Sequence, residues 1–292
     1  MAKDRGLCEA ASVALRLAKT VVKGSVPGGE PSRTPGEGLE YVDFRDYEPG
    51  DDVRYIDWRL TARMLGPDGS NRVIVKVFRA ERSVRTVLVV DLSESMLFGS
   101  KALAGLYTAF LVLETAHLLR DRVSLAIVAR GRVRRSPYTQ PRLAAEMLRV
   151  LACREGGGGA GGLDMVTQLI ASIPRRGPVV VVTDYAHSLE ELRSLLRYAS
   201  ARSCRVAMYT VLDPAEVAPP VDKGYALFTD PESGVAVPAE LGEFYAASRL
   251  HVSRIRTVAR LLGAIHVDAL WSRGLQNPYR VIDAYLRARH GA

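Results

Sequence analysis

Three stretches of the chain, residues 84–91, 178–184 and 204–213, are continuous apolar runs rich in β-branched side chains. Such runs are typical of strands buried on both faces, as in a parallel sheet. Between them, residues 101–119 and 188–200 carry apolar positions at helical spacing. Strands that alternate with helices of this length predict an α/β fold with a doubly wound, mostly parallel sheet and helices on both faces.

The chain on either side of this pattern is organised differently. Residues 5–22 predict an amphipathic helix, and residues 24–38 are so rich in Gly and Pro that they predict a loop. Alternating residues predict strands at 39–47 and 72–81. We therefore expect three parts: an N-terminal helix, loop and β elaboration packed on the core (1–83), the α/β core (84–270) and a helical C-terminal tail (271–292). Further predicted elements are hairpins at 123–138 and 226–238, helices at 141–152, 163–173 and 239–262, and a strand at 264–270.

The composition is that of a folded protein with a sizeable core. Of the 292 residues, 48% are hydrophobic, which excludes disorder as the dominant state. The formal charge is +8, which is compatible with an acidic partner but does not identify one. No secretory signal pattern is visible, and the most apolar helical stretch, 102–119, contains Glu114 and His117. We therefore expect a buried helix there and a cytoplasmic protein.

The three cysteines, Cys8, Cys153 and Cys204, lie far apart in the sequence and form no C-x-x-C pair. An odd number of cysteines with such spacing favours neither a disulfide framework nor a zinc site. We expect reduced thiols that pack as small apolar side chains.

Two acidic residues lie where ligands bind in a doubly wound sheet, outside the carboxyl ends of its strands. Asp91 ends the first apolar run and opens the segment Asp91-Leu92-Ser93-Glu94-Ser95, and Asp184 ends the second run. Asp91, Ser93 and Ser95 offer one carboxylate and two hydroxyls, the hard oxygen donors that suit Mg²⁺ or Mn²⁺. We expect Asp184 to act through a further water. The alternative is a strand-to-helix turn stabilised by Asx and Ser caps.

Two segments resemble those of known families. The Asp-Leu-Ser-Glu-Ser segment after an apolar strand resembles the metal-ion-dependent adhesion site of von Willebrand factor type A domains. Upstream, FRDYEPGDDVRYIDWRLTARM resembles the hallmark of the domain of unknown function 58 family, whose members carry such an A-like domain. The R-x-Y-x-P-G-D-D-x-R-x-I-D-W core of this hallmark is matched by Arg45, Tyr47, Pro49, Gly50, Asp51, Asp52, Arg54, Ile56, Asp57 and Trp58.

The resemblance implies a non-catalytic protein-interaction module with a von Willebrand A-like core. It implies that a divalent cation, Mg²⁺ or Mn²⁺, on Asp91, Ser93, Ser95 and Asp184 keeps an open coordination position for a partner's carboxylate. It also implies a partner class, the MoxR-type AAA+ ATPases, for which the protein would be an adaptor in the remodelling or maturation of other proteins. The candidate interaction residues of the hallmark are Arg45, Asp51, Asp52, Arg54, Asp57 and Trp58.

One position departs from the adhesion-site pattern. In that pattern a Thr from a separate loop also binds the metal, whereas the matching segment here has Leu163, and Thr167 lies a turn later inside the predicted helix. Three alternatives follow: a weaker site, a water or Gly-loop carbonyl in place of the Thr, or a site that no longer binds metal. The Gly-rich run at 156–162 is expected to form a mobile loop at the rim of the site.

Two other classes of function compete with the interaction module. A metal-dependent phosphatase or nuclease would use the same carboxylates, but no G-x-S-x-G motif is present, and Ser93 stands where a haloacid-dehalogenase-like phosphatase has its second Asp. A nucleic-acid binder would use Arg130, Arg132, Arg134 and Arg135. Only Tyr138 is an aromatic neighbour of that cluster, so a charged edge hairpin is the favoured interpretation.

The acidic residues of the hallmark region are expected to pair with nearby arginines and to hold the N-terminal elaboration against the core. The acidic residues are Asp43, Asp46, Glu48, Asp51, Asp52 and Asp57, and the arginines are Arg45, Arg54, Arg59 and Arg63.

Overall fold

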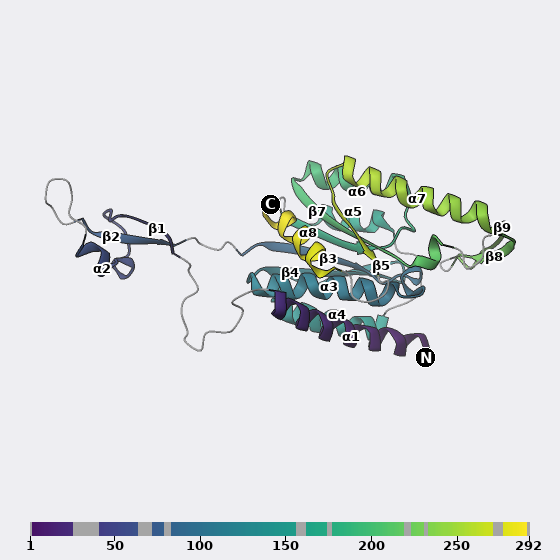
Figure 1. Cartoon of the computed structure of the whole chain (residues 1–292), viewed down its shortest axis with the longest axis horizontal. Helices are drawn as coiled ribbons and strands as arrows, with labels where there is room; N and C mark the ends of the chain where they lie inside the picture. Colours follow the sequence, from purple (N-terminus) through teal and green to yellow (C-terminus); the bar gives the residue numbers. More distant parts are fainter. Residues whose placement is uncertain are drawn as a thin grey trace. The chain divides into compact units, whose positions relative to one another are not determined.

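The structure is a computed structural model, drawn in Figure 1. It describes residues 2–25, 41–63, 72–78, 83–155, 162–173, 177–218, 223–230, 233–270 and 277–290. The chain divides into two compact units. Met1–Pro27 and Ser83–Ala292 form one, termed the core unit, and Gly28–Arg82 forms the other, termed the hallmark unit. Each is described by itself.

A six-stranded sheet forms the centre of the core unit. Its strand order is β10-β7-β6-β3-β4-β5, and all neighbouring strands are parallel except β4 and β5. The predicted α/β class with a mostly parallel sheet is confirmed. The strands are β3 (Arg85–Asp91), β4 (Arg122–Ala129), β5 (Arg132–Arg135), β6 (Gly177–Thr183), β7 (Cys204–Leu212) and β10 (Ile265–Leu270).

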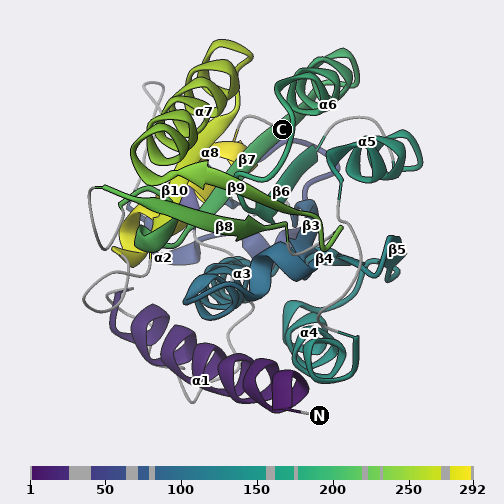
Figure 2. The same cartoon turned by 90° about the vertical axis from the view of Figure 1, so that its right-hand side faces the viewer.

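Helices cover both faces of this sheet (Figure 2). Alternate residues of β3 enter two separate apolar cores: Val87 and Val89 pack with α5, α6 and α7, whereas Leu88 and Val90 pack with α1, α3, α4 and α8. Burial on both faces explains why the strand sequence is apolar throughout rather than alternating. The helices are α1 (Ala2–Ser25), α3 (Lys101–Leu118), α4 (Pro141–Glu155), α5 (Leu163–Ala171), α6 (Leu189–Ala201), α7 (Leu241–Leu261) and α8 (Pro278–His290).

Helix α1 belongs to the core unit, although we expected it in a separate N-terminal part. Its residues Leu7, Ala11, Leu15 and Val22 are buried at helical spacing, and the helix packs against α3 and α4. Helix α3 is apolar almost all round, as a helix that is covered on every side must be. The expectation of a buried helix at 102–119 is therefore confirmed, and α1 supplies part of its cover.

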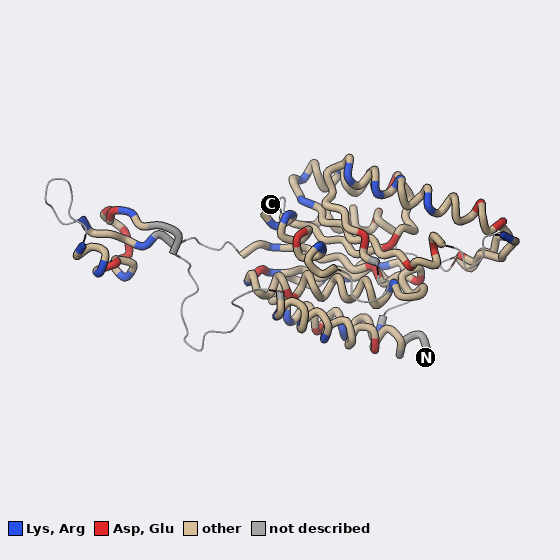
Figure 3. The backbone as a smooth tube through the Cα atoms, viewed as in Figure 1, with Lys and Arg blue, Asp and Glu red and all other residues tan. Residues whose placement is uncertain are grey.

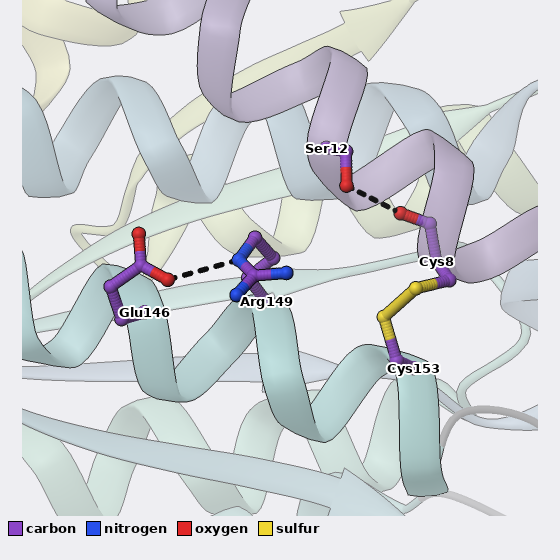
Figure 4. The surroundings of a disulfide bond; sticks show 5 residues. All are labelled: Cys8, Ser12, Glu146, Arg149 and Cys153. Carbon is purple, nitrogen blue, oxygen red and sulfur yellow. Dashed lines mark hydrogen bonds and ion pairs between the residues drawn. A yellow bond between two sulfur atoms is a disulfide. The ribbon is translucent and has the colours of Figure 1, made fainter.

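A disulfide joins Cys8 on α1 to Cys153 near the end of α4 (Figure 4). The prediction that these two cysteines are reduced was wrong. The two residues are separated by 145 positions in the sequence, and they meet because α1 and α4 lie side by side on α3. Cysteine spacing carries no information about such a meeting of helices. Cys204 is buried and lies outside this disulfide, as expected for a reduced thiol.

The C-terminal part of the chain also packs into the core unit, so no boundary separates residues 271–292 from it. Helix α8 buries Tyr285, whose hydroxyl donates a hydrogen bond to Asp121 (2.8 Å) and lies 3.1 Å from the Thr86 hydroxyl. Arg289 donates to the same Asp121 carboxylate (2.8 Å). Between β7 and α7 lie the 3₁₀ helix η3 (Pro214–Glu216) and the hairpin β8 (Tyr225–Thr229) and β9 (Ala236–Glu240), which confirms the predicted hairpin.

The hallmark unit is a two-stranded antiparallel sheet with two short helices. The strands are β1 (Tyr41–Asp46) and β2 (Ile74–Phe78), and the helices are η1 (Val53–Tyr55) and α2 (Trp58–Thr61). Ion pairs hold it together: Arg45–Asp51 (2.6 Å), Arg54–Asp52 (2.7 Å), Lys76–Asp57 (3.2 Å) and Arg72–Asp46. The predicted pairing is thus confirmed for Arg45 and Arg54, whereas Asp46 and Asp57 pair with basic residues of the β2 segment. All four pairs lie within this unit.

Candidate functional site

The two predicted acidic residues lie on adjacent parallel strands at the carboxyl edge of the sheet. Asp91 is the last residue of β3, and Asp184 follows the last residue of β6, its hydrogen-bonded neighbour. The chain leaves β3 toward α3 on one face and leaves β6 toward α6 on the other. This is the topological switch point of the sheet, the place where doubly wound folds bind ligands.

The Asp91-Leu92-Ser93-Glu94-Ser95 segment turns inward on itself. The Asp91 carboxylate accepts a hydrogen bond from the backbone N–H of Ser93 (2.9 Å), and the hydroxyl oxygens of Ser93 and Ser95 lie 3.1 Å apart. All three side chains are buried, and the 3₁₀ helix η2 (Glu94–Leu97) carries Ser95. The two serine hydroxyls therefore lie side by side, and the Asp91 carboxylate is held against the backbone of the same turn.

Two residues outside the predicted site set, Thr183 and His187, complete the surroundings of Asp91. The Thr183 hydroxyl donates to the Asp91 carboxylate (2.7 Å) and lies 2.5 Å from His187 Nε2. The Thr183 hydroxyl therefore lies between the Asp91 carboxylate and the His187 ring, and the tautomer of His187 sets which of the two side chains donates in that contact. Thr183 is the polar residue directly before Asp184 at the end of the second apolar run. This position was the available signal that Thr183 belongs to the site.

Asp184 forms an ion pair with a buried lysine, Lys101. Lys101 Nζ donates to Asp184 Oδ2 (2.9 Å) and to Glu216 Oε1 (2.7 Å), and only 2% of the lysine side chain is exposed. The second Asp184 oxygen accepts from the backbone N–H of Ala186 (2.9 Å). We expected Asp184 to reach a metal through water, but in the structure its charge is balanced by Lys101. The available signal was the single Lys at the start of a mostly apolar helix.

The two carboxylates consequently differ in their proton affinity. Burial would raise the pKa of Asp184, but the charges of Lys101 and His187 outweigh it and hold that pKa below the ordinary aspartate range. Burial raises the pKa of Asp91, and the nearby charge of Asp184 adds to the increase. Burial would likewise lower the pKa of Lys101, but Asp184 and Glu216 raise it, so the lysine stays charged. The charge of His187, whose Nε2 lies 3.7 Å from Asp91 Oδ2, opposes the increase in the Asp91 pKa, and no described Lys or Arg pairs with Asp91.

The donors around Asp91 fit a small hard cation. One carboxylate and two adjoining hydroxyls are ligands of the type that Mg²⁺ takes while it keeps several waters. Leu163 contributes nothing to this set, because its side chain is buried in the apolar core beneath α5, and the Thr167 hydroxyl donates to the Leu163 carbonyl within the helix (2.9 Å). Among the described residues, no group of three or more His, Cys, Asp or Glu side chains is placed to hold a metal ion. Most of the Gly-rich run, 156–161, lies outside the described residues.

The predicted interaction residues of the hallmark lie in the other unit. Arg45, Asp51, Asp52 and Arg54 form the two ion pairs described above, and the Asp57 carboxylate accepts from the backbone N–H groups of α2. Trp58, at the start of α2, is 66% exposed. A large aromatic side chain that is left in water is typical of surfaces that dock a partner. The hallmark acids and bases therefore hold the local shape, and the exposed large apolar side chains of this unit include Val53 as well as Trp58.

The core unit is therefore an α/β protein with a mostly parallel sheet and a polar cluster at its switch point. The chain belongs to the DUF58 family, described as a protein of unknown function, whose sequence profile matches residues 43–252. The chain is 30% identical over 270 residues to the uncharacterized protein Rv1480 of Mycobacterium tuberculosis. The aligned region covers 87% of this chain and 82% of that protein. An uncharacterized protein of Mycobacterium bovis, Mb1516, is similar to the same extent.

Solved structures with a similar arrangement are more distant in sequence. A conserved hypothetical protein BatB from Bacteroides thetaiotaomicron is 16% identical with a TM-score of 0.45, covering 70% of this chain and 98% of that one. The SpRpn10 VWA domain is 12% identical with a TM-score of 0.40, covering 70% of this chain and 95% of that one. Among the described residues, no helix has the length and apolar character needed to cross a bilayer.

Proposed function

We propose that this protein is a cytoplasmic, non-catalytic interaction module that acts as an adaptor for a MoxR-type AAA+ ATPase in the remodelling or maturation of other proteins. The observation that carries the proposal is the convergence of Asp91, Ser93 and Ser95 at the switch point of the sheet. The family resemblance of the hallmark and the Asp-Leu-Ser-Glu-Ser segment supplies the class of partner.

A divalent cation, Mg²⁺ or Mn²⁺, is part of the proposal. Asp91, Ser93 and Ser95 would hold it directly, while Asp184 stays paired with Lys101. Bound there, the cation supplies an open coordination position for a carboxylate of the partner. The chain itself prepares the position: the backbone N–H of Ser93 and the Thr183 hydroxyl orient the Asp91 carboxylate, and Lys101 keeps Asp184 ionised.

A binding role rather than a hydrolytic one is supported by the direction of the hydrogen bonds. An activated Thr would donate its proton to a histidine base, whereas the Thr183 hydroxyl donates to the Asp91 carboxylate. Thr183 is also buried, with 1% of its surface exposed. A phosphatase or nuclease that uses the same carboxylates is the alternative that the experiments below separate.

The cation is tested by thermal unfolding of the purified protein. Saturating Mg²⁺ or Mn²⁺ is expected to raise the midpoint of the wild type, because a ligand at a hundred times its Kd stabilises the folded state by about 2.7 kcal/mol. Asp91→Asn should show no such increase. In chelator, Asp91→Asn should be at least as stable as the wild type near neutral pH, because a carboxylate whose pKa is raised by folding weakens the native state when it is ionised. Equal metal-induced shifts in both proteins would remove Asp91 from the site.

The partner is tested by binding to the MoxR-type ATPase from the same organism, with and without chelator. Wild-type protein in Mg²⁺ is expected to bind at least about tenfold more tightly than Asp91→Ala or than wild type in chelator, a loss of about 1.4 kcal/mol or more. Asp283→Ala, which removes an exposed acid on α8, is the control and should bind normally. Equal binding in all conditions would contradict the cation-dependent mechanism. Hydrolysis of phosphate esters or nucleic acid that Asp91→Asn abolishes would favour the enzyme.

A further inference from the structure

Helices α6 and α7 have an uneven distribution of charge. The acidic residues of α6 are Glu190 and Glu191, and that of α7 is Glu243, and all three lie in the first turn of their helix. Beyond those turns, both helices carry only basic charged residues, which Figure 3 shows as a series of blue segments along their length. The exposed arginines are Arg193 and Arg197 on α6 and Arg249, Arg254 and Arg260 on α7.

These arginines have no acidic partners. None of the five lies within ion-pair distance of a carboxylate in the part of the chain that the structure describes, in contrast to Arg256 of α7, which pairs with Asp268 of β10 (3.0 Å). Arg193 and Arg254 line the same groove between the helices, of about 400 Å³, together with Leu189, Ser253, Thr257 and Val258. No carboxylate lines this groove. Two positive charges that face each other across a groove favour the binding of an anion there.

Two large apolar side chains stand in the same surface. Leu250 is 52% exposed and Leu261 is 79% exposed. They lie four residues before and seven residues after Arg254, so the three side chains form one stripe along the outer side of α7. The opposite side of the helix buries Val252, Ile255 and Ala259 in the core beneath the sheet. The outer surface therefore alternates arginine with exposed leucine.

We propose that the outer face of α6 and α7 docks on an anionic lipid bilayer. Arginines attract the phosphate groups of anionic lipids, and exposed leucines enter the boundary between headgroups and acyl chains. A nucleic acid would favour aromatic side chains on which bases stack. The exposed aromatic residues of the described parts of α6 and α7 are Tyr198 and Phe244, and Phe244 is stacked on Phe228 of β8. The formal charge of +8 favours approach to a negative surface. This docking is independent of the switch-point site.

The test is flotation of the full chain with vesicles of phosphatidylcholine, alone or mixed with phosphatidylglycerol. We expect binding only to vesicles that contain phosphatidylglycerol, with a steep loss as salt is raised. Arg193→Glu with Arg254→Glu should lower the partition coefficient at least about tenfold, because each basic residue near an anionic surface contributes a several-fold factor. Leu250→Ser with Leu261→Ser should lower it at unchanged charge.

A matched control lies on the other side of the sheet. Helix α4 exposes Arg142 next to Leu143, which is 56% exposed, so Arg142→Glu with Leu143→Ser changes the same residue types away from α6 and α7. This variant is expected to bind vesicles like the wild type. The proposal is overturned if the wild type ignores anionic vesicles, if the control loses binding equally, or if the α6–α7 arginines are needed for binding an RNA oligonucleotide instead of vesicles. Unfolding midpoints of all variants establish that they are folded.

Discussion

Replacement of Lys101 by methionine is expected to lower the free energy of unfolding by about 3–5 kcal/mol in chelator at neutral pH, the usual consequence of removing one partner from a buried ion pair. The ammonium group is the shared hydrogen-bond donor of Asp184 and Glu216, and Asp184 is 1% exposed. Methionine fills a similar volume but leaves a buried carboxylate without its cation. Urea unfolding followed by circular dichroism measures the loss.

The control for this variant is Lys19→Met, which replaces an exposed lysine of α1 and should change stability by less than about 0.5 kcal/mol. The pH dependence gives a second test. Folding lowers the pKa of Asp184, so its contribution is fully present above the ordinary aspartate pKa of about 3.9 and is lost as pH falls through the lower native value. Lys101→Met should weaken this dependence. Ordinary surface substitutions change stability by about 0.5 kcal/mol. If Lys101→Met stays within about 1 kcal/mol of the wild type, Lys101 does not have the assigned role of balancing the buried Asp184.

Loss of the Cys8–Cys153 disulfide is expected to destabilise the protein by about 2–5 kcal/mol, because the cross-link restricts the unfolded chain over a long loop. The two cysteines are 145 residues apart in the sequence. At about 2–4 °C per kcal/mol for chains of this approximate size, Cys8→Ser should lower the Tm by roughly 4–20 °C. A comparable decrease is expected when the wild type is reduced with dithiothreitol.

Two readouts separate this effect from a packing defect at residue 8. Dithiothreitol should lower the Tm of the wild type but leave Cys8→Ser unchanged, since the variant has no cross-link to reduce. Thiol titration of the unfolded wild type should detect only Cys204 before reduction and all three cysteines afterwards. Three reactive thiols in the unreduced protein would show that the two helices are held by apolar contacts alone.

The local patterns of the sequence predicted most of the core unit. The apolar runs that became β3, β6 and β7 could be recognised because a strand covered on both faces needs apolar residues at every position. The cluster of Asp91, Ser93 and Ser95 could be predicted because its residues are close together in the sequence. Residues separated by two positions after a strand can converge through one turn of the backbone, and Asp91 reaches the Ser93 N–H in that way.

The parts that the sequence did not predict depend on residues far apart along the chain. Lys101 meets Asp184 across 83 residues and Glu216 across 115. The spacing of apolar residues in α1 and α8 predicts that each helix buries one face. It does not predict which part of the core that face packs against, because any exposed apolar surface would suit it. The boundaries that we predicted for the N-terminal and C-terminal parts therefore differ from those of the two compact units.

The sequence by itself determined the class of fold, the three oxygen donors after β3 and the family of the protein, since each depends on residue types within a short segment. Only the tertiary structure decided that a lysine balances Asp184, that Thr183 and His187 surround Asp91, and that Cys8 is bonded to Cys153. The physical reason is that burial and ionic pairing arise where separate helices and strands pack together.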